Sequence, residues 1–190
     1  MNRKFLAVVI AIFALAAGII VTTNEQEVTE VDTGPISVSF KLADLEGGER
    51  DFSEWHGQHR ILNFWATWCA PCRREIPLLK AFQDQHGSAG IQVIGIAVEF
   101  PEPVIAYAET AEFNYPILVG EQDAMAVAES SGISFVGLPF TMIVARDGEL
   151  ISAHMGEIHQ AYLNEVAQVL LQLDRGEIDK ETARSAMDIF

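Results

Sequence analysis

Residues 61–66 form a short, nearly continuous apolar run, and the only two cysteines of the chain, Cys69 and Cys72, follow it at once. A run of this length is typical of a strand that is buried on both faces of a sheet. Beyond the cysteines, apolar residues recur at helical spacing over residues 73–85. The sequence therefore predicts a strand that passes directly into a helix, with the cysteine pair at the junction.

The rest of the chain continues this alternation of strand and helix patterns. Further strands are predicted at residues 91–98, 115–119, 140–145 and 150–154, and helices at residues 103–113, 124–131 and 157–173. Asp147-Gly148 predicts a two-residue hairpin turn between the last two strands. Strands that alternate with helices and end in a hairpin and a helix describe an α/β domain, with a central mixed sheet flanked by helices.

A different pattern occupies residues 1–23. Arg3 and Lys4 precede an apolar run of 17 residues, 5–21, which spans about 26 Å as a helix and approaches the ~30 Å hydrocarbon core of a bilayer. Because basic residues precede the run and acidic residues follow it, the positive-inside rule exports the remainder of the chain. We expect a retained membrane anchor. A cleaved signal peptide is the alternative interpretation, since residues 14–16 fit the small-x-small cleavage pattern.

The polar and acidic residues 24–35 indicate a linker, residues 36–173 the folded domain, and residues 174–190 a charged tail that could add a helix. Residues 36–42 alternate strictly between apolar and polar, which predicts a half-buried strand, and Gly47-Gly48 predicts a hairpin turn after it. The formal net charge is −15. An acidic surface repels phosphate backbones, so nucleic acid is excluded as a partner.

The spacing of the cysteines favours chemistry over a structural staple. A disulfide that closes so small a loop stabilises a fold by roughly 2 kcal/mol, against about 4.7 for a 100-residue loop. At a helix N-terminus, unpaired N–H groups and the helix dipole favour a thiolate. We therefore expect Cys69 to be the attacking thiol and Cys72, one turn further in, the resolving thiol. Pro71 fits the first turn, where a missing N–H costs little.

Release of a mixed disulfide requires deprotonation of Cys72, and hence a base nearby. Glu75 lies three residues after Cys72 and can face the same side of the helix. The other interpretation of Glu75 is an ordinary solvent-facing acid. A zinc site completed by His56 and His59 is disfavoured, because a flexible segment before a strand is a poor frame for a closed site. We expect no metal and no cofactor.

The segment FWATWCAPC, residues 64–72, resembles thioredoxin-like proteins, and more narrowly the TlpA/ResA group of membrane-tethered bacterial thiol–disulfide oxidoreductases. The similarity covers about residues 36–173. Pro77 matches the proline that kinks the active-site helix of this fold, and residues 137–141, GLPFT, match its cis-proline segment. The resemblance implies a cis peptide bond at Pro139 and substrate contacts from Trp68, Pro71, Leu138 and Pro139.

Asn63 departs from thioredoxin itself, which has a buried aspartate there as a proton acceptor. The TlpA/ResA group commonly carries asparagine at this place and glutamate where Glu75 stands, so the resemblance implies that Glu75 is a functional acid/base. It also implies an N-terminal hairpin extension at residues 36–52 and a central insertion at residues 99–115.

These features predict a protein-disulfide reductase at the inner membrane, with its domain outside the cytoplasm. The oxidised pair would be reduced again by a membrane-embedded thiol donor. The resemblance implies cytochrome c maturation as the setting, with apocytochrome c as a substrate. Two other interpretations stay open: a disulfide oxidant or isomerase, and a copper-binding assembly factor that uses the cysteines with His154. Peroxidase activity is disfavoured, because the pair lacks the Thr-x-x-Cys arrangement.

Overall fold

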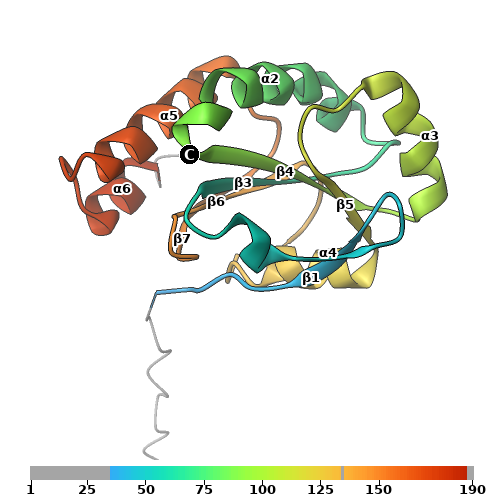
Figure 1. Cartoon of the computed structure of the whole chain (residues 1–190), viewed down its shortest axis with the longest axis horizontal. Helices are drawn as coiled ribbons and strands as arrows, with labels where there is room; N and C mark the ends of the chain where they lie inside the picture. The colour runs from blue at the N-terminus through green and yellow to red at the C-terminus, as the bar shows by residue number, and fades with distance from the viewer. Residues whose placement is uncertain (1–34, 134, 188–190) are drawn as a thin grey trace, which may run out of the picture. The chain divides into compact units, whose positions relative to one another are not determined.

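The computed structural model describes residues 35–133 and 135–187, which build a mixed seven-stranded sheet with helices on both faces (Figure 1). The strands follow the order β2-β1-β5-β4-β3-β6-β7. Their bounds are β1 Lys41–Asp44, β2 Glu49–Asp51, β3 His59–Trp65, β4 Ile91–Val98, β5 Ile117–Gly120, β6 Phe140–Val144 and β7 Leu150–Met155. β4 runs parallel to β3 and β5, and the other pairs are antiparallel. The predicted architecture is confirmed.

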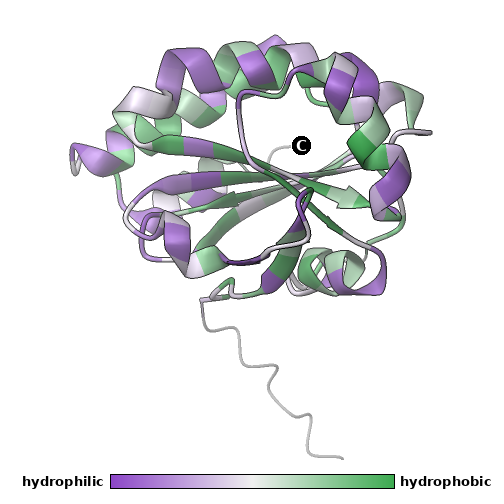
Figure 2. Cartoon of the chain, turned by 45° about the vertical axis from the view of Figure 1, so that its right-hand side comes forward, coloured by the Kyte–Doolittle hydropathy of each residue, from purple (hydrophilic) through white to green (hydrophobic). Residues whose placement is uncertain are grey.

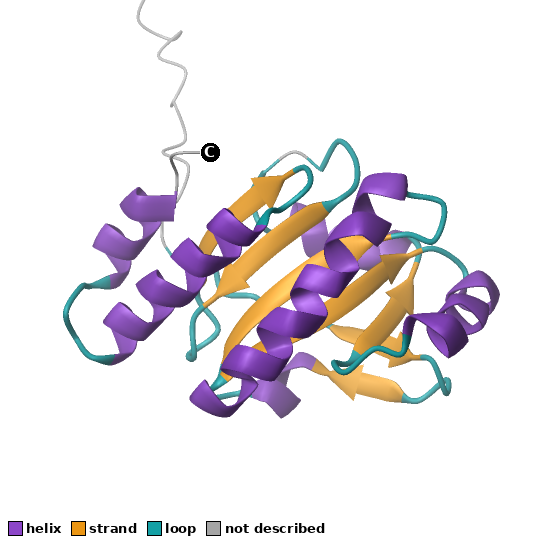
Figure 3. Ribbon diagram, turned by 90° about the horizontal axis from the view of Figure 1, so that it is seen from above, coloured by secondary structure: helices purple, strands orange, loops and turns teal. Residues whose placement is uncertain are grey.

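Two layers of helices bury the two faces of the sheet. One face is covered by α2 (Ala70–His86), α3 (Pro101–Ala111), α5 (Gln160–Asp174) and α6 (Lys180–Met187). The other face is covered by α4 (Gln122–Glu129) and the short 3₁₀ helix η1 (Phe52–Trp55), while η2 (Gly87–Ala89) links α2 to β4. Figure 3 shows α2 and α5 lying across the same face of the sheet.

The central strand β3 explains why its sequence is apolar almost throughout. Ile61 and Trp65 pack under α2, while Leu62 and Phe64 point to the opposite face, beneath α4. Because both faces are covered, each position of the strand is buried, and the usual alternation of polar and apolar residues is lost. Figure 2 shows the resulting concentration of hydrophobic residues along the inner strands.

The first predicted strand is shorter than its sequence pattern. Residues 36–42 alternate, yet β1 begins at Lys41 beside β5. Ser37 instead forms an isolated bridge to Glu149, and Val38 N–H donates to the Gly148 carbonyl at 2.9 Å. The segment thus crosses beneath the sheet from β7 to β5. Val38 is buried during this crossing, which produces the alternation without a continuous strand.

The turn between β6 and β7 is one residue longer than predicted. Ala145 N–H donates to the Glu149 carbonyl and Gly148 N–H to the Ala145 carbonyl, so three residues lie between the paired ends. Gly148 has φ +98°, a left-handed conformation that glycine adopts without steric cost and that closes hairpins of this length.

α6 belongs to the packed core. Ala183 and Met187 are buried in the cluster that α2 and α5 form over the sheet. The compact unit therefore continues past residue 173, because the short helix covers β7, which would otherwise expose its face. In the described part of the chain no helix is both long and apolar enough to cross a bilayer. The predicted anchor, residues 1–23, and all of the predicted linker except Pro35 lie outside the described residues.

Candidate active site

The cysteine pair lies at the carboxyl end of β3, where the chain turns into α2. Cys69 is the N-cap residue of α2, with extended backbone angles of φ −82° and ψ 101°. Its Sγ is bonded to Cys72 Sγ, the Cα atoms are 5.3 Å apart, and Cys72 N–H points to Cys69 Sγ at 3.3 Å. In the reduced protein that N–H and the helix dipole would stabilise a thiolate on Cys69.

The two cysteines differ in exposure. Cys69 retains 5% of its accessible surface, whereas Cys72 retains none. A disulfide partner can therefore approach Cys69, while Cys72 is shielded within the first turn of the helix. Pro71, between them, occupies one of the first two helical positions, as the sequence predicted.

Glu75 lies one turn beyond Cys72 and is completely buried, with an exposed fraction of 0%. Burial raises the pKa of its carboxyl to about 7, against the opposing effect of hydrogen bonds from Ile158 N–H and from the Asn63 side chain. These bonds measure 2.9 Å to Oε2 and 2.7 Å to Oε1. The carboxyl can thus hold or release a proton near neutral pH inside a site that excludes water.

Asn63 connects Glu75 to the neighbouring strand β6. Its Nδ2 also donates to Thr141 Oγ1 at 3.1 Å, and Asn63 and Thr141 are directly paired across the antiparallel strands. Thr141 is buried and had no assigned role in the sequence interpretation. Its position in the cis-proline segment, two residues after Pro139, was the available signal.

The pairing of β6 with β3 brings the segment that precedes β6 close to the cysteine pair. Phe140 pairs with Phe64 near the carboxyl end of β3. The residues just before Phe140 therefore lie at the same end of the strands as Cys69, the N-cap residue of α2. The Leu138–Pro139 peptide bond is cis, as expected. The Pro139 carbonyl accepts a hydrogen bond from Gly156 N–H at 2.9 Å. Leu138 packs against the buried apolar residues of both faces of the sheet.

The loop between β3 and Cys69 is held by an acid that the sequence interpretation missed. Glu99, just after β4, accepts from Thr67 N–H and from Thr67 Oγ1, both at 2.8 Å. Trp68 follows and leaves 68% of its surface exposed, directly beside Cys69. The structure therefore brings six of the seven predicted site residues to the same end of the central strands: Trp68, Cys69, Pro71, Cys72, Leu138 and Pro139. The seventh, Glu75, is buried one helical turn beyond Cys72.

His154, the residue considered for a copper site, lies on β7. Its ring packs against the ring of Tyr162 at 4.8 Å, and burial lowers the pKa of the imidazole. Among residues 35–133 and 135–187, no group of three or more His, Cys, Asp or Glu side chains is arranged to hold a metal ion.

Comparison with known proteins gives consistent matches over this domain. Residues 34–153 match the model of the AhpC/TSA family. The chain is 32% identical over 152 residues to the "Thiol-disulfide oxidoreductase ResA" of Geobacillus thermodenitrificans, covering 78% of this chain and 85% of that protein. It is 31% identical over 145 residues to the ResA protein of Geobacillus kaustophilus, covering 76% and 81%. A thiol:disulfide interchange protein of the thioredoxin family from Chlorobium tepidum superposes with a TM-score of 0.66 at 27% identity, covering 74% of this chain and 99% of that one.

Proposed function

Since this chain belongs to the AhpC/TSA family and is a ResA-like thiol–disulfide oxidoreductase, we propose that it works as a reductant of protein disulfides. The observation that supports this proposal is the placement of Glu75. It is a buried acid with a pKa raised to about 7, one helical turn beyond the buried Cys72. A resolving thiol without access to water requires such a base.

The first step uses the more exposed thiol. The Cys69 thiolate attacks one sulfur of a substrate disulfide, the substrate S–S bond breaks, and the second substrate sulfur leaves as a thiolate that takes a proton from water. A mixed disulfide between Cys69 and the substrate remains. The Cys72 N–H and the N-terminus of α2 lower the free energy of the attacking anion.

The second step uses the buried pair of Cys72 and Glu75. Ionised Glu75 takes the thiol proton of Cys72, and the resulting thiolate attacks Cys69 Sγ. The mixed disulfide breaks, the remaining substrate sulfur leaves as a thiolate that takes a proton from water, and a disulfide forms between Cys69 and Cys72. Two electrons have passed to the substrate, and the proton on Glu75 returns to the Cys72 sulfur when the pair is reduced again.

The exposed rim beside Cys69 provides the surface for a protein substrate in this proposal. Trp68 is exposed and Pro71 half-buried, one residue before and two residues after Cys69, while the half-buried Leu138 and the buried Pro139 come just before β6. An aromatic side chain with most of its surface exposed next to a reactive atom is suited to an apolar contact with a partner.

We further propose that the domain works outside the cytoplasm, held at the inner membrane by residues 1–23. The basic residues before the apolar run and the acidic residues after it support this orientation. A membrane-embedded thiol donor would return electrons to the oxidised pair. The resemblance to the TlpA/ResA group supports cytochrome c maturation as the setting, with apocytochrome c among the substrates.

Trapping tests this proposal on the full chain. Cys72→Ala retains the attacking thiol and removes the resolving one, so it should accumulate mixed disulfides on Cys69, and the double variant with Cys69→Ser should accumulate none. The reduction potential of the Cys69–Cys72 pair decides the direction of electron flow. A value well to the oxidising side of about −180 mV, where protein disulfide isomerase lies, would contradict a reductant.

A further inference from the structure

Arg60 is a buried cation that forms no ion pair with any residue in the described part of the chain. It lies on β3, at the opposite end of that strand from the cysteine pair, and only 1% of its surface is exposed. Among the residues that the structure describes, no carboxylate lies within ion-pair distance of its guanidinium. Burial lowers the pKa of Arg60 to about 10, and the charge of Asp147 opposes this effect weakly. A buried charge without a counter-ion is costly and calls for a partner.

The hydrogen bonds of Arg60 use one nitrogen of the guanidinium. Nη1 donates to the Gln58 carbonyl and, at 2.9 Å, to the Arg146 carbonyl, and the group lies 4.6 Å from the centre of the Phe52 ring. Nε is buried without a partner, and Nη2 has no hydrogen bond within the described residues. Of the five N–H groups of arginine, the three on the Nε–Nη2 edge are therefore free. N–H groups of a guanidinium form strong, charge-assisted hydrogen bonds to carboxylates and phosphates.

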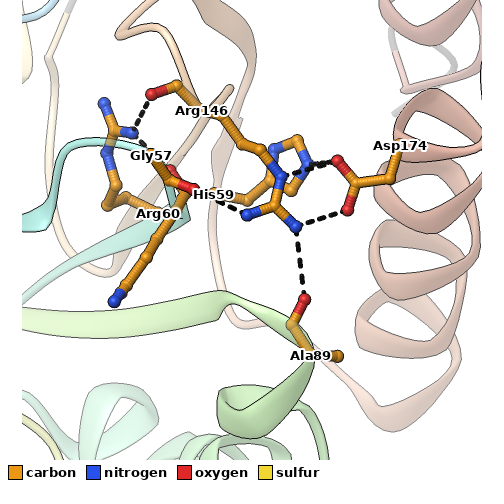
Figure 4. A network of polar contacts seen from close by, with 7 residues as sticks. Gly57, His59, Arg60, Ala89, Arg146 and Asp174 are labelled. Atoms are coloured by element: carbon orange, nitrogen blue, oxygen red, sulfur yellow. Dashed lines mark hydrogen bonds and ion pairs between the residues drawn. The ribbon is translucent and has the colours of Figure 1, made fainter.

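The neighbouring polar network does not supply the missing anion. Arg146 forms a bidentate ion pair with Asp174, which also contacts His59 Nε2 at 2.9 Å. Figure 4 shows that the guanidinium of Arg60 lies on the far side of this network, turned away from Asp174. The carboxylate of Asp174 is thus engaged elsewhere.

A small cavity opens against Arg60. Its volume is about 110 Å³, and its lining includes Ser37, Phe52, Arg60, Asp147 and Gly148. A Cβ atom placed on Gly148 would lie 3.7 Å from Arg60 Nη2 and 3.8 Å from Ser37 Oγ, so both groups border the space that this glycine leaves empty. The volume corresponds to about four water molecules, enough for a phosphate-sized ion and far below the ~300 Å³ of cofactor pockets.

We propose that this cavity binds a small oxyanion, held by Nη2 of the Arg60 guanidinium and by the Ser37 hydroxyl. The shared chemistry is that of phosphate, sulfate and carboxylate, each of which offers oxygens that accept hydrogen bonds from a guanidinium nitrogen and from a hydroxyl. Asp147 also lines the cavity, but its carboxylate is paired with Lys180, which offsets its charge. Occupancy would join the segment before β1 to the turn between β6 and β7, the two parts of the chain that carry Ser37 and Gly148.

The test measures thermal unfolding of the full-length oxidised protein while sodium phosphate, sulfate or acetate replaces sodium chloride at constant ionic strength. Specific binding raises the unfolding temperature along a saturating curve at millimolar concentration, and ³¹P line broadening gives the dissociation constant for phosphate. Equal responses to acetate and phosphate would identify the carboxylate as sufficient. A response to phosphate and sulfate alone would identify the tetrahedral ion.

Variants separate this site from a general salt effect. Ser37→Ala should weaken phosphate binding about three- to tenfold, and Arg60→Gln about 100-fold. Because Arg60→Gln could fail to fold, Ser37→Asp provides a second test. It delivers a carboxylate to the guanidinium from within the chain, so it should raise the unfolding temperature in chloride and abolish the phosphate response.

The matched control is Ser185→Ala, which removes an exposed hydroxyl on α6 that does not line the cavity and should behave like the parent. Sulfate and phosphate also stabilise proteins by exclusion from their surfaces. A stabilisation that is linear in salt and equal in the parent and in Ser37→Asp would overturn the proposal, as would identical unfolding in phosphate and chloride.

Discussion

Asn63 donates a hydrogen bond from Nδ2 to Glu75 Oε1 at 2.7 Å, and this contact joins the centre of the sheet to the helix that carries the cysteine pair. Asn63 Oδ1 is buried and has no hydrogen-bond partner among the described residues. Asn63 therefore offers donors to Glu75 and Thr141 and accepts nothing in return. This arrangement favours the ionised carboxylate, while burial favours the protonated form, and the balance gives a pKa of about 7.

The first prediction concerns Glu75→Gln. The pKa of Glu75 is near 4.5 in the unfolded chain and about 7 in the folded protein, so the folded protein binds more protons between these pH values. Stability should therefore fall as pH rises from about 4.5 to 7, by about 3 kcal/mol in total. The glutamine variant should lose this dependence, as measured by urea unfolding of the oxidised protein at pH 5 and pH 8.

The same substitution should slow resolution of the mixed disulfide about 100-fold, because glutamine cannot accept the Cys72 proton. Glu102→Gln, which alters an exposed acid on α3, serves as the control and should leave both the pH slope and the rate unchanged. If Glu75→Gln left the pH dependence of the free energy of unfolding unaltered, the pKa of the Glu75 carboxyl would not be raised by folding.

A second prediction tests the packing beneath α2. A Cβ on Gly95 would lie 2.7 Å from Ile117 Cδ1 and 3.2 Å from Trp65 Nε1, so Gly95→Ala should overpack the core and destabilise the protein by about 1–3 kcal/mol. Ile117→Val removes the clashing methyl group and alone should cost about 0.5–1.5 kcal/mol. The double variant should be more stable than the sum of the two losses implies. Strict additivity in chemical unfolding would contradict this account.

The third prediction concerns Asp174, which ends α5 and binds Arg146 and His59 (Figure 4). The hydrogen bond from Arg146 lowers the pKa of Asp174 to about 2. Its contribution to stability is present above the unfolded pKa near 3.8 and is lost as pH falls toward 2. Asp174→Asn should cost about 1 kcal/mol at pH 7 after allowance for solvent screening. The difference between parent and variant should shrink as pH falls through about 2 in guanidinium unfolding, and a difference that does not shrink would exclude a charge effect.

A fourth prediction separates docking from stability at Trp68. Because 68% of this side chain is exposed, Trp68→Ala should change the free energy of unfolding by less than about 0.5 kcal/mol. The kcat/KM for a protein disulfide should nevertheless fall about tenfold, while reduction of a small disulfide such as oxidised glutathione should change little. Ile133→Ala, at another exposed apolar position, is the control. Equal losses with both substrates would indicate a defect at the cysteines themselves.

The sequence predicted the elements of the fold closely where burial on both faces leaves an unmistakable pattern. β4 has the predicted bounds, and the cysteine pair lies at the predicted junction of β3 and α2. The crossing of residues 36–40 beneath the sheet was not predictable, because local alternation is the same for a strand and for an extended segment that buries Val38.

The hydrogen-bond partners of the buried polar groups also could not be predicted from the sequence. Glu75 accepts from Ile158, 83 residues further along the chain, and Asn63 donates to Thr141, 78 residues away. Such pairs depend on how β6 and the loop after β7 pack beside α2, which no periodicity encodes. The burial of Arg60 could not be predicted either, because arginine is usually exposed and this one lies near the start of an apolar strand.

The hydrogen bond from Ile158 N–H to Glu75 Oε2 makes this backbone amide a built-in spectroscopic reporter of the active site. An amide proton that points to a carboxylate shifts downfield when the carboxylate ionises, and Ile158 lies in the loop after β7, outside the α2 helix that carries the cysteines. Its chemical shift in a ¹⁵N-labelled sample would therefore record the titration of Glu75 in the oxidised and the reduced protein, without a label at either sulfur.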